Sequence, residues 1–323
     1  MNLFSSIILL GGLGLLFGIV LAYASKKFEV KVDERISKIL EVLPGANCGG
    51  CGFPGCSGLA SAIVNKTAPI NGCPVGGNEC SIKIGNIMGV KSETGIKEVA
   101  KIICKGNCNV SKEKYIYDGI NDCRVANNLS FGPKSCKYGC LGFGSCKDVC
   151  KFNAITIEDN IAYIDEEKCV MCGKCIDICP KHIIIKKPKN NDVVVECASE
   201  EFGKDVKEKC SVGCIGCGIC KKQCKFDAIS FENKIAKINY DKCVECMLCV
   251  EKCPIKVIKG DLSSKKVLFI DEPICIGCGI CKKQCKFDAI SGDIKKPHLI
   301  DSNKCIGCNI CTQKCPKGAI KSI

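Results

Sequence analysis

Cysteines are the residues of this sequence best suited to chemistry, and there are 34 of them in 323 residues. The stretch CIGCGICKKQCKFDAIS occurs twice without a difference, at residues 214–230 and 275–291. Each copy has the spacing C-x2-C-x2-C-x3-C, in which three thiolates hold one [4Fe–4S] cluster and the fourth reaches a second one. This spacing predicts an iron–sulfur protein that conducts electrons.

Two other uses of cysteine fit the pattern less well. Disulfide scaffolds are typical of short secreted chains, and a chain of 323 residues is not short. A structural zinc ion takes two separated pairs of ligands, whereas these cysteines come in tight groups of four. A zinc-rich interaction scaffold is therefore the weaker alternative, and a metal analysis would separate the two.

The repeated stretch is the first half of a two-cluster unit, which a second cysteine run completes. Runs of the same spacing stand at residues 169–179, 243–253 and 305–315. If the fourth cysteine of each run crosses to the other run, five regular ligand sets result. These expected sets are Cys150, Cys169, Cys172 and Cys175; Cys214, Cys217, Cys220 and Cys253; Cys224, Cys243, Cys246 and Cys249; Cys275, Cys278, Cys281 and Cys315; and Cys285, Cys305, Cys308 and Cys311.

The remaining set of the first unit is irregular. In GCLGFGSCKDVCKFNAI, residues 139–155, Phe143 occupies the place of Cys217 in the repeat. Cys123 is one replacement for the missing ligand, and Cys136 is the one we expect. The same alignment pairs Cys123 with Cys197, and Cys136 with Cys210, and it leaves the state of Cys197 and Cys210 open. The expected set is Cys136, Cys140, Cys146 and Cys179.

A glycine-rich loop near the N-terminus predicts a seventh cluster. The sequence NCGGCGFPGC at residues 47–56 lets the backbone wrap closely around a bulky centre, because glycine tolerates conformations that other residues avoid. Its expected ligands are Cys48, Cys51, Cys56 and Cys73. Four irregularly spaced cysteines leave an eighth cluster open, and they could equally be a mixture of free and paired thiols. They are Cys80, Cys104, Cys108 and Cys123.

Residues 3–24 contain no charged side chain. A helix of this length would reach roughly 33 Å, enough to cross the hydrocarbon of a bilayer. A cleaved signal peptide is the alternative, but no lysine or arginine precedes the apolar run. Lys26 and Lys27 follow it, and the positive-inside rule then places the rest of the chain in the cytoplasm. We expect a single-pass anchor in the cell membrane, in contact with lipid over residues 3–24.

An apolar helix followed by LPGANCGGCGFPGCSGLA, CPVGG and ferredoxin repeats resembles the RnfB family, the B subunits of the Rnf ion-translocating oxidoreductase complexes, in a long form. The resemblance covers essentially the whole chain. It implies that reduced ferredoxin donates electrons and that membrane-embedded subunits of the complex receive them. The whole complex would couple ferredoxin oxidation by NAD+ to translocation of Na+ or H+. A stand-alone membrane-anchored polyferredoxin, for electron carriage or storage, is the alternative function.

Other classes of function lack support in the sequence. The formal charge of +13 treats every cysteine as neutral, and each oxidised cluster with its thiolates would contribute about −2. The clusters would therefore offset most of the positive charge, and we expect no nucleic-acid partner. No nucleotide-binding glycine motif or nucleophile–base arrangement is present. We expect no flavin or NAD site and no catalytic residue in this chain, which alone would be a non-catalytic relay.

The expected fold class is α+β, with a transmembrane helix, a small helical cluster domain and three tandem two-cluster units. Alternating segments such as AISFENKIAKINYD predict short strands joined by turns. The sequence of residues 81–103 predicts two short helices that are separated at a glycine. The expected divisions are residues 1–25 for the anchor, 30–90 for the glycine-loop domain, 91–135 for a connector, and 136–188, 189–260 and 261–323 for the three ferredoxin-like units.

Overall fold

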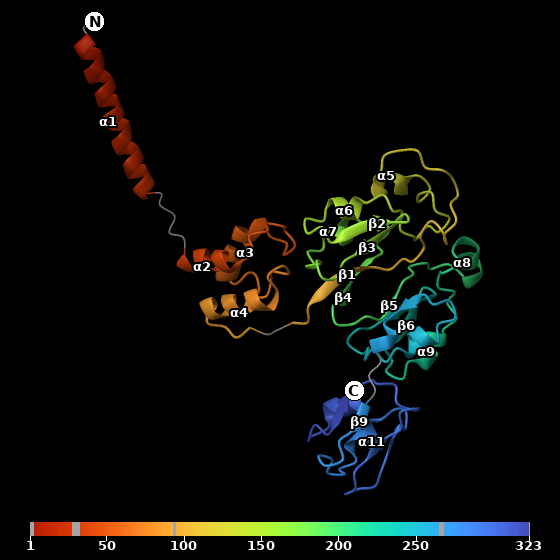
Figure 1. Ribbon diagram of the computed structural model, residues 1–323. Helices are drawn as coiled ribbons and strands as arrows, with labels where there is room; N and C mark the ends of the chain where they lie inside the picture. The colour runs from red at the N-terminus through yellow and green to blue at the C-terminus, as the bar shows by residue number, and fades with distance from the viewer. Residues whose placement is uncertain (1–2, 28–32, 93–94, 265–267, 323) are drawn as a thin grey trace. The chain divides into compact units, whose positions relative to one another are not determined.

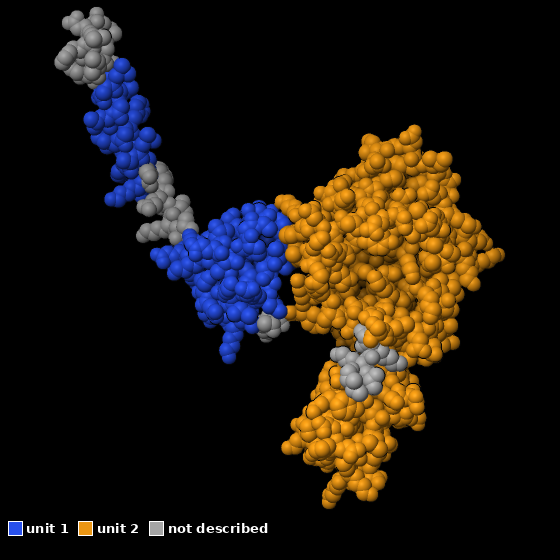
Figure 2. Space-filling model, in the orientation of Figure 1, with its two compact units in different colours: residues 1–93 blue, residues 94–323 orange. Residues whose placement is uncertain are grey.

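The computed structural model describes residues 3–27, 33–92, 95–264 and 268–322. The chain forms two compact units, residues 1–93 and residues 94–323 (Figure 2). Apart from the long helix α1, the described part consists of short helices and two-stranded antiparallel sheets (Figure 1). The α+β class expected from the sequence is confirmed.

The first helix, α1, runs from Leu3 to Lys27. Its described side chains begin at Leu10, and all large apolar side chains from there to Tyr23 are exposed. Among the residues that the structure describes, no helix is both long and apolar enough to cross a membrane. The structure therefore does not show the transmembrane helix expected over residues 3–24.

Three helices form the rest of the first unit: α2 (Glu34–Val42), α3 (Gly55–Val64) and α4 (Gly77–Met88). Asp33 caps α2 by accepting a hydrogen bond from the backbone N–H of Arg35 at 2.9 Å, as short polar side chains do at helix starts. The buried core between the helices includes Ile39, Leu59 and Ile84. This small apolar core holds the glycine-rich cysteine loop between α2 and α3.

The prediction of a second short helix within residues 81–103 is wrong, because residues 98–102 form a strand. This strand, β1 (Glu98–Ile102), pairs antiparallel with β4 (Ile184–Pro188). A partner so distant in the sequence overrides local helix propensity. The first ferredoxin-like unit therefore begins at β1, and the expected connector, residues 91–135, lies largely inside that unit.

The three ferredoxin-like units of residues 94–323 share one plan (Figure 1). In each, the first and last strands pair, a short hairpin lies between them, and a short helix follows each cysteine loop. The first unit contains β1, β4, the hairpin β2 (Ile155–Glu158) and β3 (Ile161–Ile164), and helices α5 (Cys123–Asn128), α6 (Ser145–Asp148) and α7 (Lys174–Ile178).

The other two units repeat this plan with shorter strands. The second unit contains β5 (Val194–Val195), α8 (Gly203–Lys209), α9 (Ile219–Gln223), β6 (Ile229–Glu232), β7 (Ile235–Ile238), α10 (Leu248–Glu251) and β8 (Ile258–Lys259). After a 3-10 turn at Leu262–Ser264, the third unit contains β9 (Leu268–Ile270), α11 (Ile280–Gln284), β10 (Ile290–Ser291), β11 (Leu299–Ile300), α12 (Ile310–Lys314) and β12 (Ile320–Ser322). The first and last strands pair as β5–β8 and β9–β12.

Cysteines belong to the core of each ferredoxin-like unit. In the first unit, Cys140, Cys146, Cys169 and Cys175 are buried together with small and branched apolar residues such as Ile155. Units with so few large side chains cannot bury much apolar surface, and such small domains usually need metals or cross-links for stability. Their fold thus depends on what the cysteines bind.

Candidate iron–sulfur sites

Three of the expected cysteine sets each surround one small cavity. The empty space in each, counting the part open to solvent, is about 350 Å³ in the first ferredoxin-like unit, about 370 Å³ in the second and about 360 Å³ in the third. The cysteines that line them are Cys150, Cys169, Cys172 and Cys175; Cys224, Cys243, Cys246 and Cys249; and Cys275, Cys278, Cys281 and Cys315. Each set combines three cysteines of one run with the fourth of the other, which is the crossed arrangement that the spacing predicts.

Two further expected sets are also brought together. Burial raises the pKa of the Cys220 thiol to about 11, and the nearby charges of Cys214, Cys217 and Cys253 contribute. The same holds for Cys311 in the third unit. Burial raises the pKa of its thiol to about 11, and the charges of Cys308, Cys305 and Cys285 contribute. These electrostatic neighbours are the members of the two remaining regular sets.

A residue with positive φ turns each regular cysteine loop into its helix. Gly173, Gly218 and Gly279 have φ of 81°, 73° and 72°, a conformation that glycine adopts without steric cost. The third cysteine of the run follows two residues later, inside the first turn of α7, α9 or α11. This places Cys175, Cys220 and Cys281 in the core, facing the same interior as their set.

In the first unit, the structure brings Cys123 rather than Cys136 next to Cys146. Burial raises the pKa of Cys146 to about 12, and its charged neighbours include Cys140, Cys123 and Cys179. The backbone N–H of Cys123, at the start of α5, donates to Oγ of Ser145 at 2.7 Å, beside Cys146. Phe143 stands at the position of the missing ligand, and the centroid of its ring lies 5.0 Å from that of Tyr117.

Cys136 has other neighbours than the members of the expected set, since it lines a cavity with Cys104, Cys197 and Cys210. Burial raises the pKa of its thiol, and the charges of Cys104 and Cys210 contribute. The connector cysteines left open as an eighth set are also divided, since Cys104 is a charged neighbour of Cys136 and Cys123 is one of Cys146. Cys80 belongs to the first compact unit, where its thiol lies near the backbone oxygen of Val42, at 3.6 Å.

The glycine-rich loop of residues 47–56 brings Cys51 and Cys56 near Cys73. Burial raises the pKa of Cys73, and the charges of Cys56 and Cys51 add to the effect. The backbone N–H groups of Gly50 and Gly76 donate to Sγ of Cys48 at 3.5 Å and to Sγ of Cys73 at 3.3 Å. Such N–H···S bonds stabilise charge on cluster sulfurs and tune the potential.

The geometry of these sites fits iron–sulfur clusters. Among the described residues, no group of three or more His, Cys, Asp or Glu side chains is placed to hold a metal ion. The cysteines stand around the cavities described above, where they could be the ligands of a bulky cluster. Ala100, for example, aims its backbone N–H at Sγ of Cys169 at 3.4 Å. When bound, the clusters would supply the one-electron chemistry, and the chain would supply ligands, N–H donors and burial.

The folds and their cysteine sites define a protein with several ferredoxin-type iron–sulfur domains. Residues 43–75 match a putative Fe-S cluster family, and residues 162–185 match a 4Fe-4S binding domain. Residues 213–257 and 268–322 each match a 4Fe-4S dicluster domain. Cys104, Cys123, Cys136, Cys197 and Cys210 lie outside all four matched segments.

Curated relatives narrow the class to one family. The chain is 49% identical over 259 residues to the B subunit of the Na+-translocating ferredoxin:NAD+ oxidoreductase complex of Acetobacterium woodii, covering 80% of this chain and 78% of the relative. It is 42% identical over 258 residues to the B subunit of the ion-translocating oxidoreductase complex of Methanosarcina acetivorans, covering 80% and 98%. A proton-translocating counterpart from Clostridium ljungdahlii is 39% identical over 255 residues, covering 78% and 90%. The chain belongs to this family, the B subunits of the Rnf complexes.

Proposed function

We propose that this chain is the electron-relay subunit of a membrane-bound complex that oxidises ferredoxin with NAD+ and translocates an ion. Reduced ferredoxin gives electrons to the chain, which passes them to the membrane subunits. The observation that carries the proposal is the arrangement of the cysteine sets, which lie in linked pairs inside each ferredoxin-like unit. The relatives named above are subunits of Na+-translocating and proton-translocating complexes, so the ion for this chain stays open.

Crossed ligands support a relay within each unit. Cys224 is the fourth cysteine of the first run in the second unit, but it lines the cavity of the second run. Conversely, Cys253 is the fourth cysteine of the second run, and its charge contributes to the raised pKa of Cys220 in the first run. Two clusters held in this way share the helices between them. An electron can then move from one to the other without any change in the fold.

Contacts between units extend the relay. Burial raises the pKa of Cys246 in the second unit, and the charge of Cys308 in the third unit contributes. The second-run sites of these two units are therefore electrostatic neighbours. This proximity would let electrons pass between the second and the third ferredoxin-like unit.

We also propose that α1 attaches the chain to the membrane, with the cluster domains on the cytoplasmic side. The sequence has no charge from Leu3 to Ala24, and Lys26 and Lys27 follow. The described apolar side chains of α1 are exposed on all sides of the helix, which suits a helix surrounded by lipid or by other apolar helices. Fractionation of cells tests this: Leu16→Lys with Val20→Lys should release the chain from membranes. A matched control, Leu40→Lys in α2, should leave the chain in the membrane fraction.

Two experiments test the relay. Reduced ferredoxin added anaerobically to the purified chain should bleach the visible absorbance of the clusters, and chain stripped of iron by a chelator should show no change. Affinity purification from detergent should retain flavin-bearing partner subunits. A stable monomer without such partners would favour the alternative, a stand-alone electron carrier. Absence of bleaching would contradict ferredoxin as the donor.

A further inference from the structure

We propose that Cys104, Cys136, Cys197 and Cys210 hold an additional [4Fe–4S] cluster, which joins the first and second ferredoxin-like units. None of the four lies in a segment matched by a known iron–sulfur family. Cys104 lies in the expected connector and Cys136 directly follows it, while the sequence leaves the role of Cys197 and Cys210 open. Together they would form an eighth site in the chain.

The four cysteines line one small cavity of the same kind as the regular sites. The empty space there, counting the part open to solvent, is about 450 Å³, against about 350 Å³ for the site at Cys169. Three glycines also line it, at Gly106, Gly139 and Gly213. A Cβ atom at Gly106 would lie only 3.4 Å from Sγ of Cys210 and 3.7 Å from Sγ of Cys104. A glycine here lets both sulfurs approach the same stretch of backbone.

Equivalent positions of two units provide the four thiols. Cys104 stands two residues after β1, and Cys197 stands two residues after β5. Cys136 and Cys210 each precede the first cysteine of their unit's first run by four residues. The third unit has Glu272 and Asp271 at the corresponding positions, so it lacks such a pair. Each of the first two units thus contributes two thiols to a site that neither could complete alone.

Every one of the four sulfurs accepts a backbone hydrogen bond. The N–H of Cys140 donates to Cys104 at 3.4 Å, and the N–H of Ser199 donates to Cys197 at 3.5 Å. Cys136 accepts from the N–H of Tyr138, and Cys210 accepts from Val212 and Gly213. The same pattern surrounds the sulfurs of the regular sites, and it stabilises the charge of a bound cluster.

A buried positive charge beside the cavity also fits an anionic centre. Lys134 is 1% exposed, and its Nζ donates to the backbone oxygens of Gly106 and Asn160, both at 2.8 Å. Among the described residues, no carboxylate lies within ion-pair distance of this lysine, and a buried charge without a counter-ion is costly. The carboxylate of Glu201 also lines the cavity, and Lys209 pairs with it at 2.6 Å. A cluster of charge about −2 would supply the counter-ion that Lys134 lacks.

The position of this site makes it a bridge. Cys104 accepts the N–H of Cys140, which belongs to the first site of the first unit. Cys197 accepts the N–H of Cys214, which belongs to the first site of the second unit. One electron leaving a reduced cluster of the first unit would reduce the bridging cluster and then pass to the second unit. Each step oxidises one cluster and reduces the next, and no atom is transferred.

The test is an iron, sulfide and zinc count on anaerobically purified full-length protein. We expect about 32 iron atoms per chain, four for each of eight clusters, and no stoichiometric zinc. Cys197→Ser and Cys210→Ser should each remove about four iron atoms, and the double variant should also remove about four, because both residues serve one cluster. The exposed Cys108 gives the matched control, since Cys108→Ser should remove none.

Three results would overturn the proposal. They are a wild-type count near 28 iron atoms, about one zinc ion per chain that disappears in Cys210→Ser, and additive iron losses in the double variant. If a serine variant does not fold, the wild-type iron and zinc counts still decide. These counts do not depend on ferredoxin, so a protein with seven clusters could still accept electrons as proposed above.

Discussion

The backbone N–H of Cys140 donates a hydrogen bond to Sγ of Cys104 across 3.4 Å. After burial, the charge of Cys104 also contributes most to the raised pKa of Cys140, although Cys104 lines a cavity with Cys136, Cys197 and Cys210. In the assignment proposed above, the bond joins two different cysteine sets rather than two ligands of one cluster. Which set contains Cys123 and which contains Cys136 becomes a question that iron counting can answer.

Double variants with Cys146 should separate the two assignments. Cys146→Ser should remove about four iron atoms, and adding Cys123→Ser should remove no more, because both thiols would serve the same cluster. Adding Cys136→Ser to Cys146→Ser should instead remove about eight, because Cys136 would serve the bridging cluster. The measurement is iron and sulfide per chain after anaerobic purification. A loss of only four in the second double variant would restore Cys136 as the ligand expected from the sequence.

The regular sites were predictable because their chemistry is local. Three cysteines spaced C-x2-C-x2-C fit one loop, so the sequence alone indicates which thiols of the second and third units come together. Crossing of the fourth cysteine follows from the known logic of two-cluster ferredoxins. The structure brings together these sets, including Cys224 with Cys243 and Cys285 with Cys308.

The irregular sites were not predictable, because their thiols come from elements far apart in the sequence. The sequence favours Cys136 because it lies close to Cys140 along the chain, but α5 carries Cys123 back to Ser145. The local sequence of residues 98–102 favours a helix, so it does not indicate that Cys104 and Cys197 follow equivalent strands. The alignment that paired Cys123 with Cys197 matched positions that are not equivalent in the fold. A strand ending two residues before a cysteine, in two units, is the signal that would have found the bridging set.

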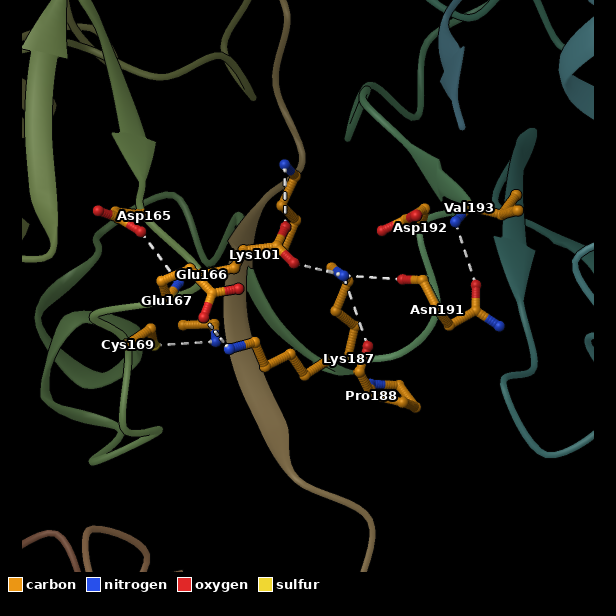
Figure 3. A network of polar contacts seen from close by, with 12 residues as sticks. Lys101, Asp165, Glu166, Glu167, Cys169, Lys187, Pro188, Asn191, Asp192 and Val193 are labelled. Carbon is orange, nitrogen blue, oxygen red and sulfur yellow. Dashed lines mark hydrogen bonds and ion pairs between the residues drawn. The ribbon is translucent and has the colours of Figure 1, made fainter. Parts of the chain in front are cut away.

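A buried ion pair beside Cys169 gives a second prediction (Figure 3). Nζ of Lys187, 1% exposed, lies 2.8 Å from Oε2 of Glu166 and donates to the backbone oxygen of Asn191 at 2.7 Å. Lys187→Met would leave the carboxylate of Glu166 with Lys101 as a more distant partner, at 3.5 Å. Removing one member of a buried pair costs about 3 kcal/mol, which lowers the midpoint of thermal cluster bleaching by roughly 6–12 °C.

Lys189 offers the matched control for that pair. Its Nζ lies 2.6 Å from Oε2 of Glu167, whose side chain is 82% exposed. Solvent screens such a pair, so Lys189→Met should cost about 1 kcal/mol or less. Equal effects of the two lysine substitutions on the bleaching midpoint would show that burial of Lys187 adds nothing.

The two copies of the repeated stretch contact each other through equivalent residues, which gives a third prediction. The rings of Phe226 and Phe287 lie 6.1 Å apart, and Nζ of Lys286 donates to the backbone oxygen of Lys225 at 2.7 Å. A pair of rings contributes about 0.5–1.5 kcal/mol beyond its buried area. Phe226→Ala with Phe287→Ala should therefore let the second and third units separate while all clusters stay bound.

Small-angle scattering measures this separation. The radius of gyration of the double alanine variant should exceed that of the wild type, at an unchanged iron count. Phe269→Ala is the control, because this ring is exposed on β9 and makes no part of the contact. An unchanged radius in the double variant would mean that other contacts hold the two units together.

The cap of α5 gives the fourth prediction, because this helix begins with Cys123. Asp122 accepts from the backbone N–H of Arg124 at 2.7 Å and of Val125 at 3.4 Å. The side chain of Arg124, more than these backbone bonds, holds the pKa of the Asp122 carboxyl well below its usual range. Losing such a cap costs about 1 kcal/mol, so Asp122→Ala should make the cluster at Cys123 bleach at a lower temperature.

The pH dependence of this effect follows from the direction of the pKa shift. A carboxyl whose folded pKa is lowered contributes its full stability above its unfolded pKa, about 4, and loses it as the pH falls below that value. The difference between Asp122→Ala and the wild type should therefore be the same at about pH 6 and about pH 8. Asp122→Asn is the control, since its side-chain oxygen can still cap the helix without the charge and should recover most of the loss. A difference that changes between these two pH values would place the stabilising group elsewhere than at Asp122.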